Sequence, residues 1–169
     1  MVNSAEGDRM ISERLGKLLV AQVASELGAH QAYLGMSLYF ERHSLHKWAK
    51  LFRDQSVEEA GHASKIMAFL VDNEVEFDLP RLPASTTQYK SATEVVQAAL
   101  ASEVKVTGQF NTMATAAVEA GDHRGLQFLQ WFIEEQVEEE RMMRALLDLL
   151  ASGINLFQAQ ELLGEIVEE

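Results

Sequence analysis

The strongest constraint on the fold of this chain is an apolar pattern of helical period that fills four long stretches. Apolar residues recur every three or four positions over about 11–40, 45–73, 92–121 and 123–152, which is the spacing of side chains on one face of a helix. Both prolines, Pro80 and Pro83, fall between the second and third stretches. No stretch shows the period-two alternation of a strand. The pattern predicts an all-α fold cut into two halves.

Short breaks within each half predict two helical hairpins. The residues R-H-S near position 43 and G-D-H near position 122 separate the paired stretches, and Ser91 with Glu94 has the form of a capping box. Gly153 closes the fourth stretch, and residues 155–167 read as a short additional helix. We expect one domain over residues 1–169: a four-helix bundle with one long crossover between helices 2 and 3 and a short C-terminal fifth helix.

Every apolar stripe carries glutamate where a bundle helix normally places a hydrophobic residue. These residues are Glu26, Glu59, Glu103, and the pair Glu135 and Glu139, and no lysine or arginine lies on the stripes. Residues equally far from a hairpin turn lie side by side. Glu26 is therefore level with Glu59, and Glu103 is level with Glu139 within about one turn. Four carboxylates are expected to meet in the middle of the bundle without an internal cation.

Two interpretations of these acids compete. A single glutamate on an apolar stripe is more often satisfied by tyrosine, tryptophan or water than by a metal, and a lone buried histidine is usually hydrogen-bonded core. Four level acids with His62 one turn from Glu59 differ, because desolvated negative charges without a counterion are too costly. Two divalent cations would balance four carboxylates. The run E-E-Q-V-E-E-E at 134–140 is then one wall of a buried two-metal site.

The sequence also predicts the energetic effect of one of these acids. Glu103 lies between Ala99 and Val106 on its stripe, with no neighbouring ligand on its own helix. Replacing it with leucine restores the stripe and removes one repelling charge. We expect Glu103→Leu to stabilise the metal-free subunit by roughly 1–3 kcal/mol.

Composition limits the partners. The 169 residues contain 26 acids and 14 bases, a net charge of −12, which disfavours nucleic acid and anionic membranes and makes cations the natural counterpart. The absence of cysteine excludes disulfides, thiolate metal sites and iron–sulfur clusters. The first ten residues lack the basic start and apolar core of a signal peptide, so we expect a cytoplasmic protein without a membrane span.

The motifs resemble the prokaryotic non-haem ferritins over about residues 11–165. The resemblance is carried by Glu59-x-x-His62, by a lone glutamate on each of two other helices, and by the string F-L-Q-W-F-I-E-E-Q-V-E-E-E. Di-iron carboxylate bundles typically carry Glu-x-x-His on two helices, whereas Glu139 is followed three residues later by Met142. Bacterioferritins and rubrerythrins are expected to have histidine there, so the single histidine favours ferritin.

The resemblance implies a set of iron ligands. One iron would be held by Glu26, Glu59 and His62, and Glu59 would bridge to a second iron held also by Glu103 and Glu139. A third iron position would be formed by the remaining acids of the motif, with Glu139 shared: Glu58, Glu135 and Glu138.

Two further residues receive roles from the resemblance. Gln136 would form a hydrogen bond in the site near the oxygen-binding position. Tyr33, two turns after Glu26 on the same face, would brace a ligand or supply an electron. The methionines at 36, 113, 142 and 143 read as packing residues, and no specific feature supports haem ligation.

The function implied is ferroxidase chemistry and iron storage. Fe(II) and dioxygen would react at the di-iron site, and Fe(III) would be stored as mineral inside a homo-oligomeric cage of 24 subunits. Mostly oxygen ligands with one imidazole suit Fe(II) or Mn(II), and the spacing alone does not choose between them. Two alternatives stay open: a di-iron enzyme with peroxide-reducing or bacterioferritin-like activity, and a DNA-protecting mini-ferritin. The second is disfavoured because that group builds its site between subunits and lacks the fifth helix, and this chain has no basic tail.

Overall fold

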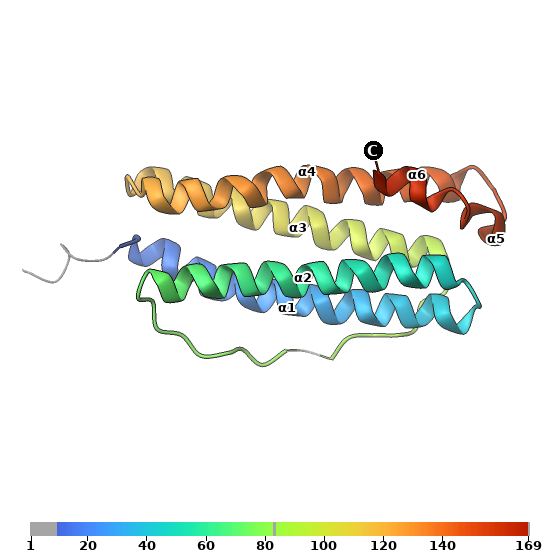
Figure 1. Cartoon of the computed structure of the whole chain (residues 1–169), viewed down its shortest axis with the longest axis horizontal. Helices are drawn as coiled ribbons and strands as arrows, with labels where there is room; N and C mark the ends of the chain where they lie inside the picture. The colour runs from blue at the N-terminus through green and yellow to red at the C-terminus, as the bar shows by residue number, and fades with distance from the viewer. Residues whose placement is uncertain (1–9, 83, 169) are drawn as a thin grey trace, which may run out of the picture.

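The chain forms a bundle of four long helices with two short helices at its C-terminal end (Figure 1). A computed structural model describes residues 10–82 and 84–168, in which no strand occurs. The helices are α1 (Glu13–Arg42), α2 (His46–Asp72), α3 (Ala92–Glu119), α4 (His123–Ala151), α5 (Leu156–Ala159) and α6 (Leu163–Glu168). The predicted all-α four-helix bundle is confirmed. Residues 1–9, which contain most of the segment examined for a signal peptide, lie outside the described residues.

Local capping fixes where the long helices begin. The Ser12 hydroxyl accepts a hydrogen bond from the backbone N–H of Leu15, and Ser91 accepts one from Glu94, as the capping box predicts. Asp122 caps α4, because its side chain accepts the Gly125 N–H at 2.7 Å. The helix starts are therefore determined largely by residues next to them in the sequence.

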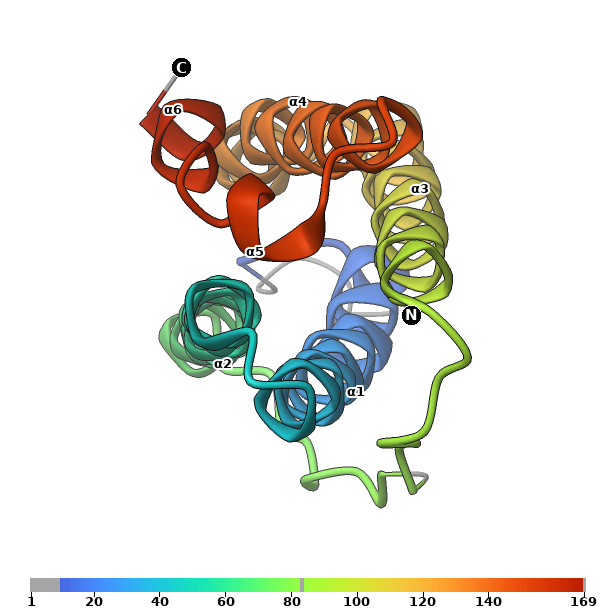
Figure 2. The same cartoon turned by 90° about the vertical axis from the view of Figure 1, so that its right-hand side faces the viewer.

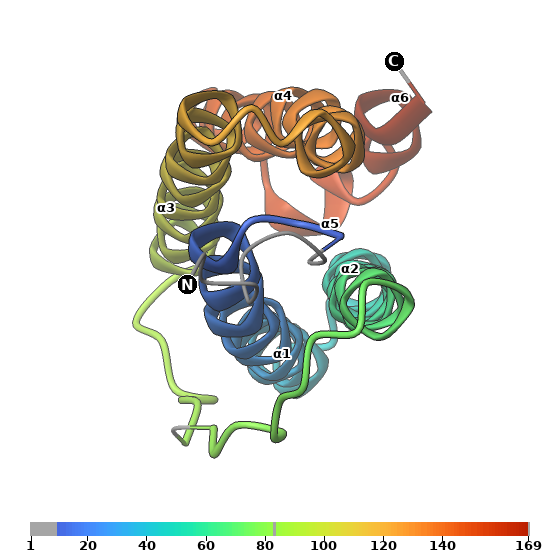
Figure 3. The ribbon, with the colours of Figure 1, turned by 90° about the vertical axis from the view of Figure 1, so that its left-hand side faces the viewer.

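The end views show the four helices at the corners of the bundle (Figures 2 and 3). α1 lies beside α2 and α3, and α3 lies beside α4. The predicted long crossover joins α2 to α3, and it runs along the outside of α1. Gly35 permits its close approach, since a Cβ there would lie 2.3 Å from the Thr86 carbonyl oxygen. Arg42 then holds the crossover by donating to the Thr87 carbonyl and hydroxyl oxygens.

The apolar core is divided into two clusters by a polar layer. One cluster contains Phe40, Trp48 and Phe52, and the other contains Leu19 and Phe110. Between them along the four long helices lie the four acids on which the sequence argument depends, all buried: Glu26, Glu59, Glu103 and Glu139. The fold thus places the predicted acids at one level in the bundle. Among the described helices, none is both long and apolar enough to cross a membrane.

Two details differ from the sequence prediction. The segment 155–167 forms two helices, α5 and α6, instead of one. The turn between them lets α5 close the end of the bundle, where Trp48 donates its indole N–H to the Leu156 carbonyl at 3.3 Å. On α4, Gln136 is buried and faces the core, whereas Glu135 is only partly buried. The inward stripe of α4 therefore passes through Gln136 and Glu139, and Glu135 lies at its edge.

Candidate metal centre

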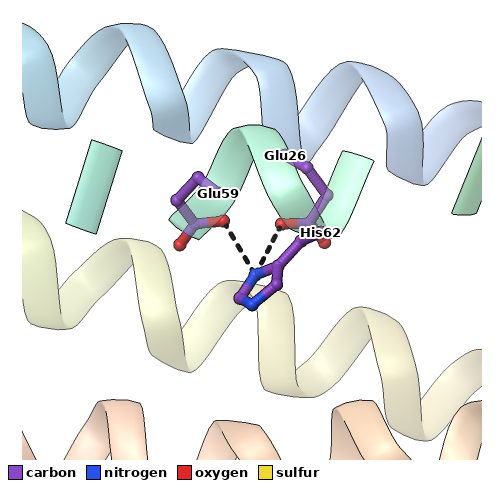
Figure 4. A group of neighbouring side chains, drawn as sticks. All are labelled: Glu26, Glu59 and His62. Atoms are coloured by element: carbon purple, nitrogen blue, oxygen red, sulfur yellow. Dashed lines mark hydrogen bonds and ion pairs between the residues drawn. The ribbon is translucent and has the colours of Figure 1, made fainter. Parts of the chain in front are cut away.

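Three side chains from the first hairpin form a fully buried group of potential metal ligands. Glu26 comes from the middle of α1, and Glu59 and His62 lie one turn apart on the same face of α2. Each offers a ligand atom, and these atoms lie within 4.8 Å of one another. His62 Nδ1 is 3.3 Å from Glu59 Oε2 and 4.0 Å from Glu26 Oε2, so the imidazole faces both carboxylates (Figure 4).

Several buried oxygen and nitrogen atoms in and around this group, all of types that can bind a metal, have no hydrogen-bond partner. They include Glu26 Oε2, His62 Nε2 and Glu139 Oε2. The other oxygen of Glu26 accepts from Gln22 Nε2 at 2.7 Å, which fixes that carboxylate. Unpaired buried polar atoms are costly, and carboxylate oxygens with an imidazole nitrogen are donors that divalent metals bind. The donor set therefore fits a divalent metal.

The second hairpin contributes two buried carboxylates with different surroundings. Both oxygens of Glu103 are hydrogen-bonded: Tyr33 donates its hydroxyl to Oε1 from α1, and Gln136 Nε2 lies 3.2 Å from Oε2. Glu139 has an oxygen without a partner. The picture of Glu103 as an uncompensated acid is wrong, because two other helices supply its donors.

The electrostatics follow from burial. Loss of hydration raises the pKa of Glu59 to about 8 and that of Glu139 to about 9, and the charge of Glu103 adds to both shifts. The pKa of Glu26 is raised well above its usual value, first by burial and then by Glu59. Among the described residues, no buried side chain is a lysine or arginine. Without a cation, Glu59 and Glu139 hold protons around neutral pH.

The remaining acids border a hollow on the side of α2 and α4. Its volume is about 130 Å³, and its lining includes Glu58, Glu135, Glu138 and the buried Glu139. Glu58, His62 and Glu135 form a second group whose ligand atoms lie within 4.8 Å of one another, and Glu138 is not part of that group. The hollow is thus lined by the buried Glu139, the partly buried Glu135 and the exposed Glu58 and Glu138.

Two residues that the sequence analysis gave no role contact the predicted ligands. Gln22 fixes Glu26, and its position four residues earlier on the same helix face could have signalled this contact. The ring of Trp131 lies edge-on to His62 with centroids 5.5 Å apart, and Lys65 Nζ lies 3.4 Å from the Trp131 ring centroid. That contact joins α2 to α4, so no local spacing could predict it.

Comparison with known proteins agrees with this architecture. Residues 16–152 match the family description "Ferritin-like domain". The chain belongs to the ferritin family. This ferritin is 34% identical to Ferritin BfrB of Mycolicibacterium smegmatis, over 85% of this chain and 80% of that protein. It is 33% identical to the bacterial non-heme ferritin of Staphylococcus haemolyticus, over 83% of this chain and 85% of that protein.

A solved structure extends the likeness to three dimensions. The fold of this ferritin superposes on an open pore ferritin from Archaeoglobus fulgidus with a TM-score of 0.87 and 26% sequence identity. The match covers 94% of this chain and 99% of that one. The family resemblance predicted from the glutamate and histidine motifs is therefore confirmed.

Proposed function

We propose that this protein stores iron after oxidising Fe(II) with dioxygen at its buried acid cluster. The observation that carries the proposal is the compact group Glu26, Glu59 and His62, whose unpartnered buried atoms lie in the middle of a ferritin-family bundle. Iron is the substrate and the cargo in this scheme. Membership of the ferritin family and the relatives named as ferritins support iron storage.

The residues divide into two ligand sets. Glu26, Glu59 and His62 would hold one Fe(II), and Glu59 would bridge to a second held by Glu103 and Glu139. Each Fe(II) gives up one electron, and the two electrons with two protons convert dioxygen to hydrogen peroxide. Mostly anionic ligands favour the Fe(III) product, and the surrounding apolar clusters limit access of solvent.

The residues around the ligands would orient them. Tyr33 holds Glu103 through its hydroxyl, so we assign it a bracing role, and its position also suits electron donation. Gln136 donates to Glu103 from the other side and would lie beside the position where dioxygen reacts. Gln136 lies within the polar layer that separates the apolar clusters, and Tyr33 belongs to the cluster of Phe40 and Trp48 and reaches that layer with its hydroxyl.

The hollow beside α2 and α4 would lead iron out of the site. Glu58, Glu135 and Glu138, with Glu139 shared, would form a third iron position between the buried pair and the surface. The unpartnered oxygen of Glu139 supports this assignment, as does the grouping of Glu58 and Glu135 with His62. The stored mineral requires an enclosed space, and we propose a homo-oligomeric cage of 24 subunits in the cytoplasm.

Two alternative functions, a DNA-protecting mini-ferritin and a di-iron enzyme, predict a different assembly or a different amount of retained iron. The candidate ligands Glu26, Glu59 and His62 all come from one chain, and two helices follow α4; both features argue against a mini-ferritin, whose site lies between subunits. A di-iron enzyme of similar fold would turn over without retaining iron.

The test is anaerobic loading with Fe(II) followed by oxygen. Absorbance would follow oxidation, and gel filtration with iron analysis would give the iron retained by each particle. We expect fast oxidation and retention far beyond the number of ligand sites. Fast oxidation with release of all iron would support the enzyme, and oxidation no faster than in buffer would overturn the proposal.

A further inference from the structure

A chain of hydrogen bonds runs from the metal centre to the outer surface of α3 and α4. Gln136 Nε2 lies 3.2 Å from both the carbonyl oxygen and Oε2 of Glu103, and 3.4 Å from Thr107 Oγ1. Thr107 donates its hydroxyl to Glu140 Oε1 at 2.7 Å. The other oxygen of Glu140 accepts from Arg144 at 2.6 Å. These bonds connect the candidate ligand Glu103 on α3, through Gln136 and Thr107, to the ion pair of Glu140 and Arg144 on α4.

This series of hydrogen bonds gives the Gln136 amide one orientation. A carboxylate can only accept, so the single hydroxyl proton of Thr107 is used by Glu140. Thr107 then presents only lone pairs to Gln136, as do the two oxygens of Glu103. A reversed amide would place its oxygen against three acceptors with no donor. Through Thr107, Glu140 therefore reinforces the amide direction that the two Glu103 oxygens already favour.

The orientation matters because Gln136 acts directly on Glu103. Tyr33 donates to one oxygen of that carboxylate and Gln136 to the other, so the carboxylate is held from two sides. A groove of about 640 Å³ on the outer face of α3 and α4 is lined by Thr107, Gln136 and Glu140. The buried amide thus separates this groove from the acid cluster, and solvent could hydrate it if its partners were lost.

We infer that Thr107 and Glu140 are positioning residues that fix the Gln136 amide and, through it, the Glu103 carboxylate for metal binding. This inference rests on the proposed function. Neither residue contacts the candidate metal positions directly. Their effect would fall on the ligand set of the second hairpin and leave Glu26, Glu59 and His62 unchanged.

The experiment is a titration of the metal-free full-length protein with Co(II), which reports ligand geometry by its visible absorption without turnover. The variants are Thr107→Val, which keeps the shape but removes the hydroxyl, and Thr107→Ser, which restores it. Thr112→Val is the matched control, because Thr112 is an exposed threonine of α3 that bonds only to Gly108 of its own helix. Circular dichroism and gel filtration would establish that each variant folds and assembles.

We expect Thr107→Val to weaken the second of two Co(II) binding steps by roughly tenfold, as is usual when a partner of a metal ligand is lost, and to change its absorption spectrum. The first step should be unchanged, and Thr107→Ser and Thr112→Val should behave as wild type. Glu140→Gln is a second test, since its amide can donate to Thr107 and free the hydroxyl to reverse. It should shift the same binding step.

The outcomes separate this inference from the proposed function. Wild-type affinities and spectra in both Thr107→Val and Glu140→Gln would overturn the positioning role while the metal centre stands. Equal weakening of both binding steps would also overturn it, because a general loosening of the bundle would then explain the effect. Absence of Co(II) binding in wild type would instead overturn the metal centre, and the inference with it.

Discussion

The two hairpins supply the same kind of candidate ligand in different ways. In the first, Glu26, Glu59 and His62 already lie within 4.8 Å of one another, and two of them come from one turn of α2. In the second, Glu139 is followed one turn later by the buried Met142 instead of histidine, and Glu103 is held by donors from α1 and α4. The first hairpin thus has two residues, Glu59 and His62, that local spacing brings together, whereas the second depends on contacts between helices throughout.

The largest expected effect comes from Glu59, the residue that would serve both hairpins. Glu59→Ala should remove the fast phase of Fe(II) oxidation, by roughly 10²-fold or more, because both metals would lose a shared ligand. Stopped-flow absorbance would measure it, with gel filtration to verify assembly. Glu134→Ala, an exposed acid of α4, is the control. A normal initial rate in Glu59→Ala would remove the bridging assignment.

The second prediction concerns pH. The raised pKa values, about 8 for Glu59 and about 9 for Glu139, mean that a metal must displace protons. Affinity for Co(II) should therefore rise between pH 6 and 9, by about tenfold per pH unit for each proton displaced. Calorimetry in two buffers of different ionisation enthalpy would count the protons. Binding without proton release would show that the cluster is ionised before metal arrives.

The same pKa values predict the stability of the metal-free protein. An acid whose pKa is higher in the folded state than in the unfolded state stabilises the fold fully below its ordinary pKa of 4.5, and this stabilisation is lost progressively as pH rises from 4.5 to the folded-state pKa values of about 8 and about 9. Denaturant melts should show stability falling over that window. A saturating divalent metal should reverse the trend. A metal-free protein that gains stability from pH 5 to 9 would contradict the assignment.

The fourth prediction sharpens the comparison at the exit from the site. Glu135→Ala should alter the ratio of oxygen consumed to iron oxidised and slow later turnovers more than the first, because Glu135 lines the hollow and is not one of the four buried acids. Oxygen-electrode measurements with successive Fe(II) additions would show it, with Glu134→Ala as the charge-matched neighbour. An unchanged ratio would remove Glu135 from the iron pathway.

The smallest expected effects separate the two acids of the second hairpin. Glu139→Leu should raise the stability of the metal-free subunit by roughly 1–3 kcal/mol, since Glu139 has an unpartnered buried oxygen. Glu103→Leu should gain less, because it leaves Tyr33 and Gln136 without their acceptor, at a cost of about 1–3 kcal/mol. Denaturant melts under conditions where the assembly dissociates would compare them. A larger gain from Glu103→Leu would mean that its hydrogen bonds contribute little.

The sequence alone determined the features that depend on neighbours along the chain. The apolar repeat defined four helices, the cap Ser91 set the start of one of them, and the spacing of Glu59 and His62 placed both on one helix face. The depth of each glutamate from its turn was also sufficient to put four acids at one level. These features follow from the fixed rise and rotation of a helix.

Only the tertiary structure decided how the helices are rotated and which side chains meet. Neighbouring residues on a helix point about 100° apart, so a modest rotation of α4 decides that Gln136 faces the core and Glu135 its edge. The donors to Glu103 come from α1 and α4, and the bond from Thr107 to Glu140 joins α3 to α4. The bond from Trp48 to the Leu156 carbonyl likewise joins α2 to α5. Such contacts join residues far apart in the sequence, and packing between helices selects them where local spacing leaves several partners possible.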